Sequence, residues 1–241
     1  MTEQVKVIHV VGQTSRQMQK GNMMIHHSIG FNPNHSVFAE ASSDFRIDAA
    51  KLTDVDSAPG EINRVIRSCF IHSAPVYIFF PLDMVDEQVP AALLDTPIDL
   101  SPPSNEDVKR NMEAACTVVV HAISEAKRPA VFVDGLIHRH NAVAEFMQLA
   151  EKLQFPIYTS FMAKGIVDES HPLHVGVYSG AGSSPGIAEA IEASDLILVF
   201  GHLPADTNTG GFSQKLPWEK KINFTTTSVN VCRVGGWRSD G

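Results

Sequence analysis

Cysteine is scarce in this sequence, and its few cysteines are widely spaced. The 241 residues contain three, Cys69, Cys116 and Cys232, and no two of them form a C-x-x-C pair. This spacing argues against a zinc knuckle and against a dithiol redox motif. Reduced thiols in a cytosolic protein are the simplest interpretation.

Long apolar runs and an excess of basic charge are also missing. The first residues, MTEQVKVIHVVG, are interrupted by Lys6 and His9 and are only as long as a strand, unlike a signal peptide. No stretch approaches the ~20 apolar residues that a membrane-spanning helix needs. A net charge of −8 offers nothing that attracts a phosphate backbone. The sequence therefore predicts a soluble, cytoplasmic protein with no nucleic-acid partner and no membrane partner.

Local signatures of common enzyme classes do not occur, including G-x-S-x-G, H-E-x-x-H and G-x-x-x-x-G-K-[ST]. The run GAGSSPG (180–186) resembles a dinucleotide-binding loop, but Pro185 displaces the last glycine, and position 202 is histidine rather than an acidic residue. We interpret this run as a turn before a helix. The histidines of His138-x-His140 and of Asp168…His171…His174 lack a metal-site spacing and are predicted to lie on surface loops.

The elements that are present alternate between strand and helix. In the first half, residues 5–11 read as a strand, 14–28 as a helix or a helix followed by a turn, 58–72 as a helix and 76–80 as a strand. Prolines scattered over 84–104 indicate a stiff linker. In the second half, a helix is expected from the cap at Ser104 to about Ala126, strands at 130–136, 156–161 and 196–201, and helices at 140–153 and 184–193. This alternation predicts an α/β fold with parallel sheets and a Rossmann-like second half.

Two adjacent histidines, His26 and His27, form the most informative local pattern. Neighbouring side chains on a helix point about 100° apart, so the pair would be poor co-ligands for one metal ion. In a bend after a helix, both rings could reach a cleft and act as acid, base or hydrogen-bond donor near neutral pH. The alternative is a pair of surface or partly buried histidines, and the local pattern alone favours that alternative.

Seven stretches, in order, resemble the pyruvate decarboxylases, a family of thiamine diphosphate-dependent 2-oxo acid decarboxylases. They are IHVVGQTS (8–15), MIHHSIG (24–30), APGEINRVIRSCF (58–70), PVYIFFPLDMVDEQVPAALLDTPIDLS (75–101), RPAVFVDG (128–135), MAKGIVDESHPLHVGVYSG (162–180) and ASDLILVFGHLPADTNTGGFS (193–213). The resemblance implies that residues 1–84 are the C-terminal part of a pyrimidine-binding domain, 85–104 a linker and 105–224 the Rossmann-like central domain. Residues 225–241 do not resemble the family.

The resemblance also implies the chemistry. Pyruvate would be decarboxylated without oxidation to acetaldehyde and carbon dioxide, with thiamine diphosphate and Mg²⁺, in a homo-oligomer (dimer or tetramer). His26 and His27 would lie beside the reactive carbon of the thiazolium ring, orient the 2-oxo acid and assist proton transfer. The catalytic acidic residues are expected before Met1 and the magnesium and diphosphate ligands after residue 224, so no cofactor-binding or metal-binding residue is predicted in this chain. Leu136 and Ile137 occupy the place of a regulatory cysteine, so activation through that thiol is not expected.

We therefore expect an internal piece of a larger lyase that is inactive by itself. One alternative is a decarboxylase for a bulkier 2-oxo acid, such as indolepyruvate or phenylpyruvate. Another is a non-catalytic, truncated binding or regulatory protein, and a third is a dinucleotide-binding module. Half of an α/β domain would leave a sheet edge uncovered, and VYIFF (76–80) at such an edge would favour aggregation.

Overall fold

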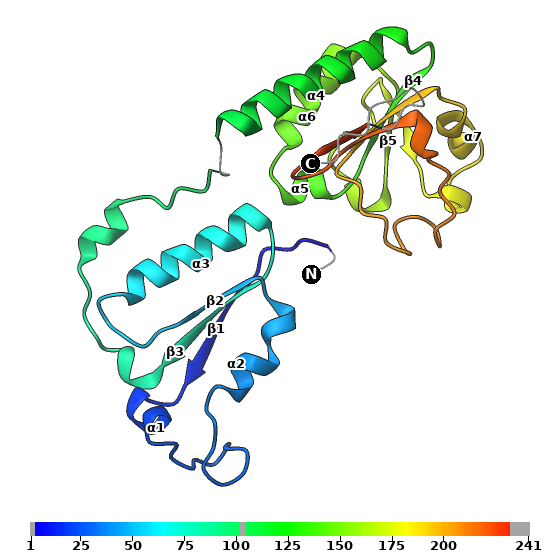
Figure 1. The fold of residues 1–241 in the computed structure, drawn as a ribbon. Helices are drawn as coiled ribbons and strands as arrows, with labels where there is room; N and C mark the ends of the chain where they lie inside the picture. The colour runs from blue at the N-terminus through cyan, green and yellow to red at the C-terminus, as the bar shows by residue number, and fades with distance from the viewer. Residues whose placement is uncertain (1–2, 102–104, 232–241) are drawn as a thin grey trace. The chain divides into compact units, whose positions relative to one another are not determined.

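The computed structural model describes residues 3–101 and 105–231. The chain divides into two compact units, Met1–Pro103 and Ser104–Gly241 (Figure 1). Both units are built on parallel strands connected through helices, so the predicted α/β class is confirmed. Among the described residues, no helix combines the length and the apolar character needed to pass through a lipid bilayer.

The first unit contains a three-stranded parallel sheet. Strands β1 (Ile8–Gln13), β3 (Val76–Pro81) and β2 (Asp48–Lys51) lie side by side in the order β1-β3-β2. The apolar run expected at an edge, VYIFF, is therefore the central strand of this sheet, with a hydrogen-bonded neighbour on both sides. The expectation that it lies at an edge is wrong for the described sheet, because β1 and β2 occupy the edges.

Helix α3 (Ala58–His72) covers one face of this sheet. It begins with proline in its first turn and Glu61 near its positively charged end, and it ends at Ser73, which adopts a left-handed conformation with φ of 48°. Its buried side chains Val65 and Cys69 pack against Val76 and other apolar residues of the strands. The predicted bounds of this helix agree with the structure.

Shorter elements connect the strands of the first unit. Helix α1 (Arg16–Lys20) is followed by a long loop and then by α2 (Val37–Ala41), so the second of the two alternatives for residues 14–28, a helix followed by a turn, is the observed one. Three short 3₁₀ helices follow, η1 (Ser43–Phe45), η2 (Leu82–Met84) and η3 (Ala91–Asp95).

The second unit contains a six-stranded sheet in the order β6-β5-β4-β7-β8-β9. Strands β4 to β8 are parallel and β9 is antiparallel to β8. The bounds are β4 (Pro129–Val133), β5 (Ile157–Thr159), β6 (His174–Val177), β7 (Leu196–Phe200), β8 (Lys221–Phe224) and β9 (Val229–Val231). Since β4 and β7 are neighbours, the strand order reverses between them, as it does at the ligand-binding edge of Rossmann-like sheets.

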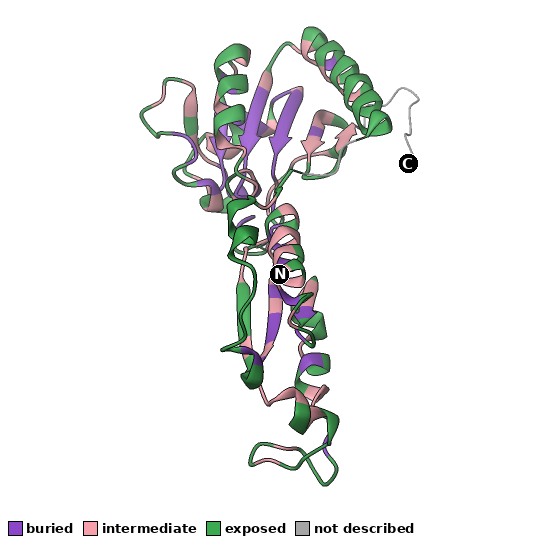
Figure 2. Cartoon of the chain, turned by 90° about the vertical axis from the view of Figure 1, so that its left-hand side faces the viewer, coloured by how far each residue is buried: buried purple, intermediate pink, exposed green. Residues whose placement is uncertain are grey.

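Helices cover both faces of this second sheet. On one face, α4 (Glu106–Glu125) and α6 (Val143–Leu153) contribute Ala122, Phe146 and Ala150 to the larger core. On the other face, α7 (Ile187–Glu192) contributes Ile191. The central strands β4 and β7 are consequently buried on both sides, as Figure 2 shows, and they read as continuous apolar runs.

The start of α4 and the ends of two strands differ in detail from the expectation. Asn105 caps α4, its side chain accepting a hydrogen bond from the N–H of Val108, whereas Ser104, the expected cap, lies outside the described residues. Strand β4 ends at residue 133 rather than 136, and the short helix α5 (Leu136–Arg139) follows it. Strand β5 ends at residue 159 rather than 161, where the 3₁₀ helix η4 (Phe161–Ala163) begins after Ser160.

Candidate functional site

His26 and His27 occupy the tip of a tight turn in the loop between α1 and α2. The N–H of Ser28 donates to the carbonyl oxygen of Ile25 at 2.9 Å, and the N–H of Ile25 donates to Oγ of Ser28 at 2.8 Å. These reciprocal bonds leave the two histidines at the central positions of a four-residue turn. Both side chains are exposed. The bend that the sequence allowed for is present, and both rings lie on the surface; the prediction of their catalytic role stays untested.

The two imidazole rings contact each other. Their centroids lie 4.8 Å apart at an interplanar angle of 84°, and Nδ1 of His27 lies 3.4 Å from Nε2 of His26. A hydrogen bond between these nitrogens requires one ring to donate and the other to accept. The centroid of the His27 ring also lies 6.3 Å from the centroid of the Phe38 ring in α2. The turn thus presents a linked donor and acceptor that could exchange a proton with a small bound molecule.

A hollow of about 360 Å³ lies in the same unit at the carboxyl ends of β1 and β2. Its basic lining residues include Arg16, Lys20 and Lys51. The backbone N–H and the guanidinium of Arg16 each donate to Asp83 at 2.8 Å, which lowers the pKa of that carboxyl group. Because Arg16 is paired with Asp83, Lys20 and Lys51 are the lining cations left to attract an anionic small molecule, and the carboxyl end of parallel strands is the usual place for one.

The second unit contains a buried carboxylate that sequence analysis did not single out. Asp134 is fully buried at the carboxyl end of β4. Its oxygens accept hydrogen bonds from the N–H of Gly135 at 2.6 Å, from the N–H of Leu203 at 2.8 Å and from Nδ2 of Asn208 at 3.0 and 2.8 Å. Oγ of Ser160, also fully buried, is a further donor. The carboxylate is therefore well satisfied, as a buried charge must be.

Asn208 extends this network to the segment after β5. Its Nδ2 also donates to the carbonyl oxygen of Leu203 at 2.9 Å, and its Oδ1 accepts from the N–H of Met162 at 3.2 Å. Asp134 and Asn208 thus join three loops that follow β4, β5 and β7. A sequence signal existed, since both residues stand in stretches that resemble a known family, but nothing in their spacing indicated that they meet.

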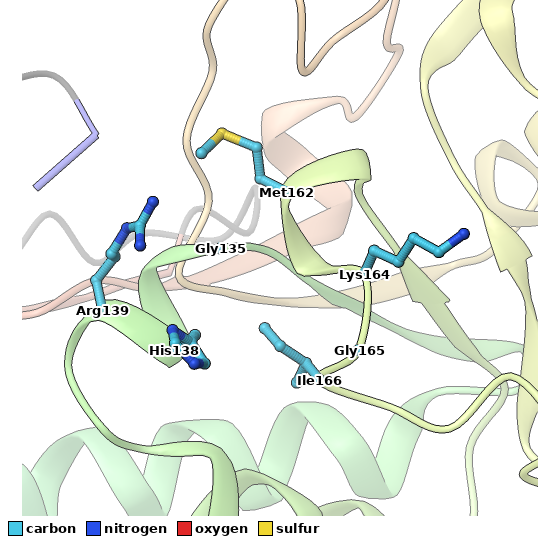
Figure 3. Close-up of a pocket in the computed structure, with 7 residues that line it drawn as sticks. All are labelled: Gly135, His138, Arg139, Met162, Lys164, Gly165 and Ile166. Carbon is cyan, nitrogen blue, oxygen red and sulfur yellow. The ribbon is translucent and has the colours of Figure 1, made fainter. Parts of the chain in front are cut away.

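A smaller hollow of about 200 Å³ lies beside this network (Figure 3). His138 and Arg139 of α5 line one side, and Lys164, Gly165 and Ile166 of the segment after β5 line the other. Nearby in the same unit, burial lowers the pKa of His202, an effect that Asp134 opposes. The segments that follow β4 and β5 form the walls of this hollow. No catalytic residue is assigned to it.

The other histidines considered from sequence do not converge. His171 contacts Glu151 at 2.8 Å, His174 contacts Oγ1 of Thr159 at 3.2 Å, and Asp168 accepts from a backbone N–H two residues along the chain. Within the described ranges 3–101 and 105–231, no three His, Cys, Asp or Glu side chains are grouped as a metal ion would require.

The first glycine of GAGSSPG allows close packing, and the last has a positive φ before a helix. Gly180 has a φ of 56°, and a Cβ at this position would overlap the side chain of Ser213. Gly186, with a φ of 87°, precedes α7, which begins only at Ile187. The interpretation as a turn before a helix is therefore confirmed, although Pro185 lies before the helix rather than in its first turn.

Comparison with known proteins agrees with this architecture. Residues 116–234 match the model described as thiamine pyrophosphate enzyme, central domain. Over these residues the chain is similar to a thiamine pyrophosphate enzyme central domain. The match runs past the expected end of the domain at residue 224 and includes β9.

The whole chain is similar to pyruvate decarboxylases of fungi. It is 41% identical over 229 residues to the pyruvate decarboxylase of Kluyveromyces marxianus. Identity is 40% over 229 residues to pyruvate decarboxylase isozyme 2 of Saccharomyces cerevisiae and 37% over 230 residues to the enzyme of Aspergillus fumigatus. Each comparison covers 95% of this chain and 40% of the relative. The resemblance seen in the sequence is confirmed, and the chain spans about two fifths of the length of these relatives.

Proposed function

We propose that this chain is the middle part of a thiamine diphosphate-dependent decarboxylase that converts pyruvate to acetaldehyde and carbon dioxide. The observation that carries the proposal is 41% identity to a pyruvate decarboxylase over 95% of the chain. Residues 1–84 would then belong to the pyrimidine-binding domain. A cytoplasmic location and assembly into a homo-oligomer form part of the proposal.

The described residues do not fit the magnesium diphosphate end of this cofactor. They contain no cluster of three or more His, Cys, Asp or Glu side chains, and in the glycine-rich run at residues 180–186 the place of a Cβ on Gly180 is already taken by Ser213 and Gln214. No step is therefore derived through the cofactor, and we assign its ligands to sequence outside this chain.

In this proposal, His26 and His27 are the residues that contact the substrate. Both rings are exposed at the tip of a turn, and they form a donor and acceptor pair at 3.4 Å. A neutral imidazole can accept a proton and an imidazolium can return it near neutral pH. The pair would orient the 2-oxo acid by hydrogen bonds and would hold and deliver the proton that the product requires.

A chimaera tests this function. Residues 5–224 would replace the matching segment of the Kluyveromyces lactis pyruvate decarboxylase, to which the chain is 41% identical. Acetaldehyde release would be measured by coupling to alcohol dehydrogenase and NADH, with and without thiamine diphosphate and Mg²⁺. We expect pyruvate-dependent activity that requires both additions.

His26→Gln and His27→Gln in the chimaera test the assigned residues. Each should lower kcat by on the order of 10²-fold, the usual contribution of a positioned acid or base. His72→Gln is the matched control, because His72 is exposed at the end of α3. Unchanged kcat in both variants would remove the histidines from the mechanism, and an inactive but correctly folded chimaera would count against the decarboxylase function.

A further inference from the structure

A third histidine, His35, bridges two segments of the first unit. Its Nε2 lies 3.0 Å from the carbonyl oxygen of Met23, and its Nδ1 lies 3.4 Å from Oγ1 of Thr14. A carbonyl oxygen only accepts, so Nε2 must carry the hydrogen of this bond. In the neutral ring, Nδ1 then accepts from the hydroxyl group of Thr14. The His35 residue is partly buried; its contact with Thr14 is partly shielded from water, whereas its bond to Met23 is exposed.

The two contacts of His35 lie on either side of α1. Thr14 directly follows β1, which ends at Gln13, and Met23 stands three residues before His26. The ring therefore ties the segment that enters the histidine turn to the carboxyl end of the sheet. The backbone on either side of His35 forms a turn, because Oδ1 of Asn34 accepts from the N–H of Ser36 at 2.9 Å just before α2 begins.

Apolar packing does little to hold the histidine turn. The apolar side chains around it are largely exposed, with Met24 and Ile29 each 64% exposed and Phe31 91% exposed. The hydrogen bonds between Ile25 and Ser28 set the shape of the turn but do not connect it to the sheet. Besides the ring contact of His27 with Phe38 and the bond from the N–H of Met23 to the carbonyl oxygen of Met18, the hydrogen bond of His35 is then a contact that restrains its orientation.

We propose that His35 is a positioning residue for the His26–His27 pair, acting through its bonds to the carbonyl group of Met23 and to Thr14. This inference rests on the function proposed above, because it concerns how the same pair is presented to substrate. His35 itself touches no substrate. A ring without nitrogens at position 35 would leave the histidine turn intact but would free its orientation relative to β1.

Three substitutions in the chimaera separate these contacts. His35→Phe keeps a ring of similar size and removes both bonds. His35→Gln keeps an N–H donor at about the place of Nε2, so it can still bind the carbonyl oxygen of Met23. Thr14→Val removes only the weaker contact. His72→Phe is the matched control for the same change at an exposed position.

The expected result is a loss of kcat of about 10- to 100-fold in His35→Phe, with KM for pyruvate changed by about twofold or less, because misplacement of a reacting group mainly slows the chemical step. His35→Gln should recover most of this loss, and Thr14→Val should lose about threefold or less. Unchanged kcat in His35→Phe would overturn the inference. So would an equal loss in His35→Gln, since that would indicate a need for the ring rather than for the hydrogen bond.

A second measurement is independent of catalysis. In the 241-residue chain labelled with [¹⁵N]histidine, long-range ¹H–¹⁵N spectra report the tautomer of His35 and the environments of His26 and His27. We expect the tautomer with the hydrogen on Nε2, and shifted ring signals of His26 and His27 in His35→Phe but not in His72→Phe. If the chimaera were inactive, shifted signals would support the positioning role while the decarboxylase proposal failed. Unmoved signals would overturn the role whatever the activity.

Discussion

Asn208→Ala provides the sharpest test of the buried network in the second unit. The substitution removes a hydrogen bond to the carboxylate of Asp134 and leaves the N–H of Met162 without its acceptor. The carbonyl group of Leu203 keeps a second donor, the N–H of Ala205 at 2.8 Å, and adds little to the cost. A bond to a buried charge contributes about 1.5–3 kcal/mol and an orphaned donor costs about 1–3 kcal/mol. We therefore expect a loss of roughly 3–5 kcal/mol in the free energy of unfolding, a large part of the ~5–15 kcal/mol of a typical domain.

The assay is urea unfolding of the 241-residue chain followed by tryptophan fluorescence. Both tryptophans, Trp218 and Trp237, follow residue 104 in the sequence, and Trp218 lies in η6 (Trp218–Lys220) of the second unit, so its fluorescence reports on that unit. Thr207→Ala is the matched control, because Thr207 is exposed beside Asn208, and it should change stability by about 0.5 kcal/mol or less.

The double variant Asp134→Ala/Asn208→Ala isolates the interaction between the two side chains. Either single change leaves a buried group without its partner, whereas the double change removes charge and partner together. The double variant should therefore lose at least ~1 kcal/mol less than the sum of the singles. A loss below ~1 kcal/mol in Asn208→Ala, or additive losses in the double variant, would refute the view that this network holds the loops together.

Two further changes test the backbone and the charges of the second unit. Gly180→Ala should destabilise it by more than Gly186→Ala, because both glycines have positive φ but only at Gly180 would a Cβ overlap Ser213; equal losses in urea unfolding would contradict this. Burial raises the pKa of Asp195, but hydrogen bonds from the N–H groups of Arg128 and of the residue before it outweigh burial, so the pKa is lowered. The stabilisation is then present above the ordinary pKa of about 3.9 and is lost as pH falls through the lowered value. Asp195→Asn should flatten the decline of the urea midpoint between about pH 5 and pH 2, and an unchanged decline would contradict the assignment.

Long elements with clear local signals were predictable from sequence. Helix α3 occupies residues 58–72 as expected, because proline in the first turn and a regular apolar stripe favour these bounds. Strand β3 was expected at residues 76–80 and ends one residue later. In these elements the local pattern and the tertiary packing agree, since the apolar stripe of α3 packs on the apolar run of β3.

The ends of β4 and β5 were mispredicted because tertiary hydrogen bonds decide where these strands stop. The run AVFVDGL continues to look like a strand beyond Val133, but Asp134 leaves the strand to accept hydrogen bonds from the loop after β7. In the same way, Ser160 ends β5 because it donates to Asp134 and caps η4. The partners in these hydrogen bonds lie far apart in the sequence, so no short stretch of sequence shows where the two strands end.

Polar and glycine-containing strands were missed for a different reason. Strand β8 contains Lys221 and Asn223 among only four residues, and β6 contains Gly176, next to which its register with β5 shifts. Their hydrogen bonding depends on the neighbouring strands rather than on an apolar run of their own. Strand β9 lies in the segment that the sequence indicated as unrelated to the family.

The candidate site illustrates the same division between residue type and placement. The sequence identified His26 and His27 through family resemblance, and the expected bend is present, but no pattern connected them to His35 nine residues away from His26. In the second unit, apolar packing on both faces of the sheet surrounds the Asp134 network and would tolerate no unsatisfied group. At the exposed histidine turn, packing supplies little such restraint beyond the contact of His27 with Phe38, so hydrogen bonds from outside the turn help to determine where the rings point. A substitution such as His35→Phe should therefore change the geometry of the histidine pair with little loss of unfolding free energy. Asn208→Ala, in contrast, should mainly lower the free energy of unfolding.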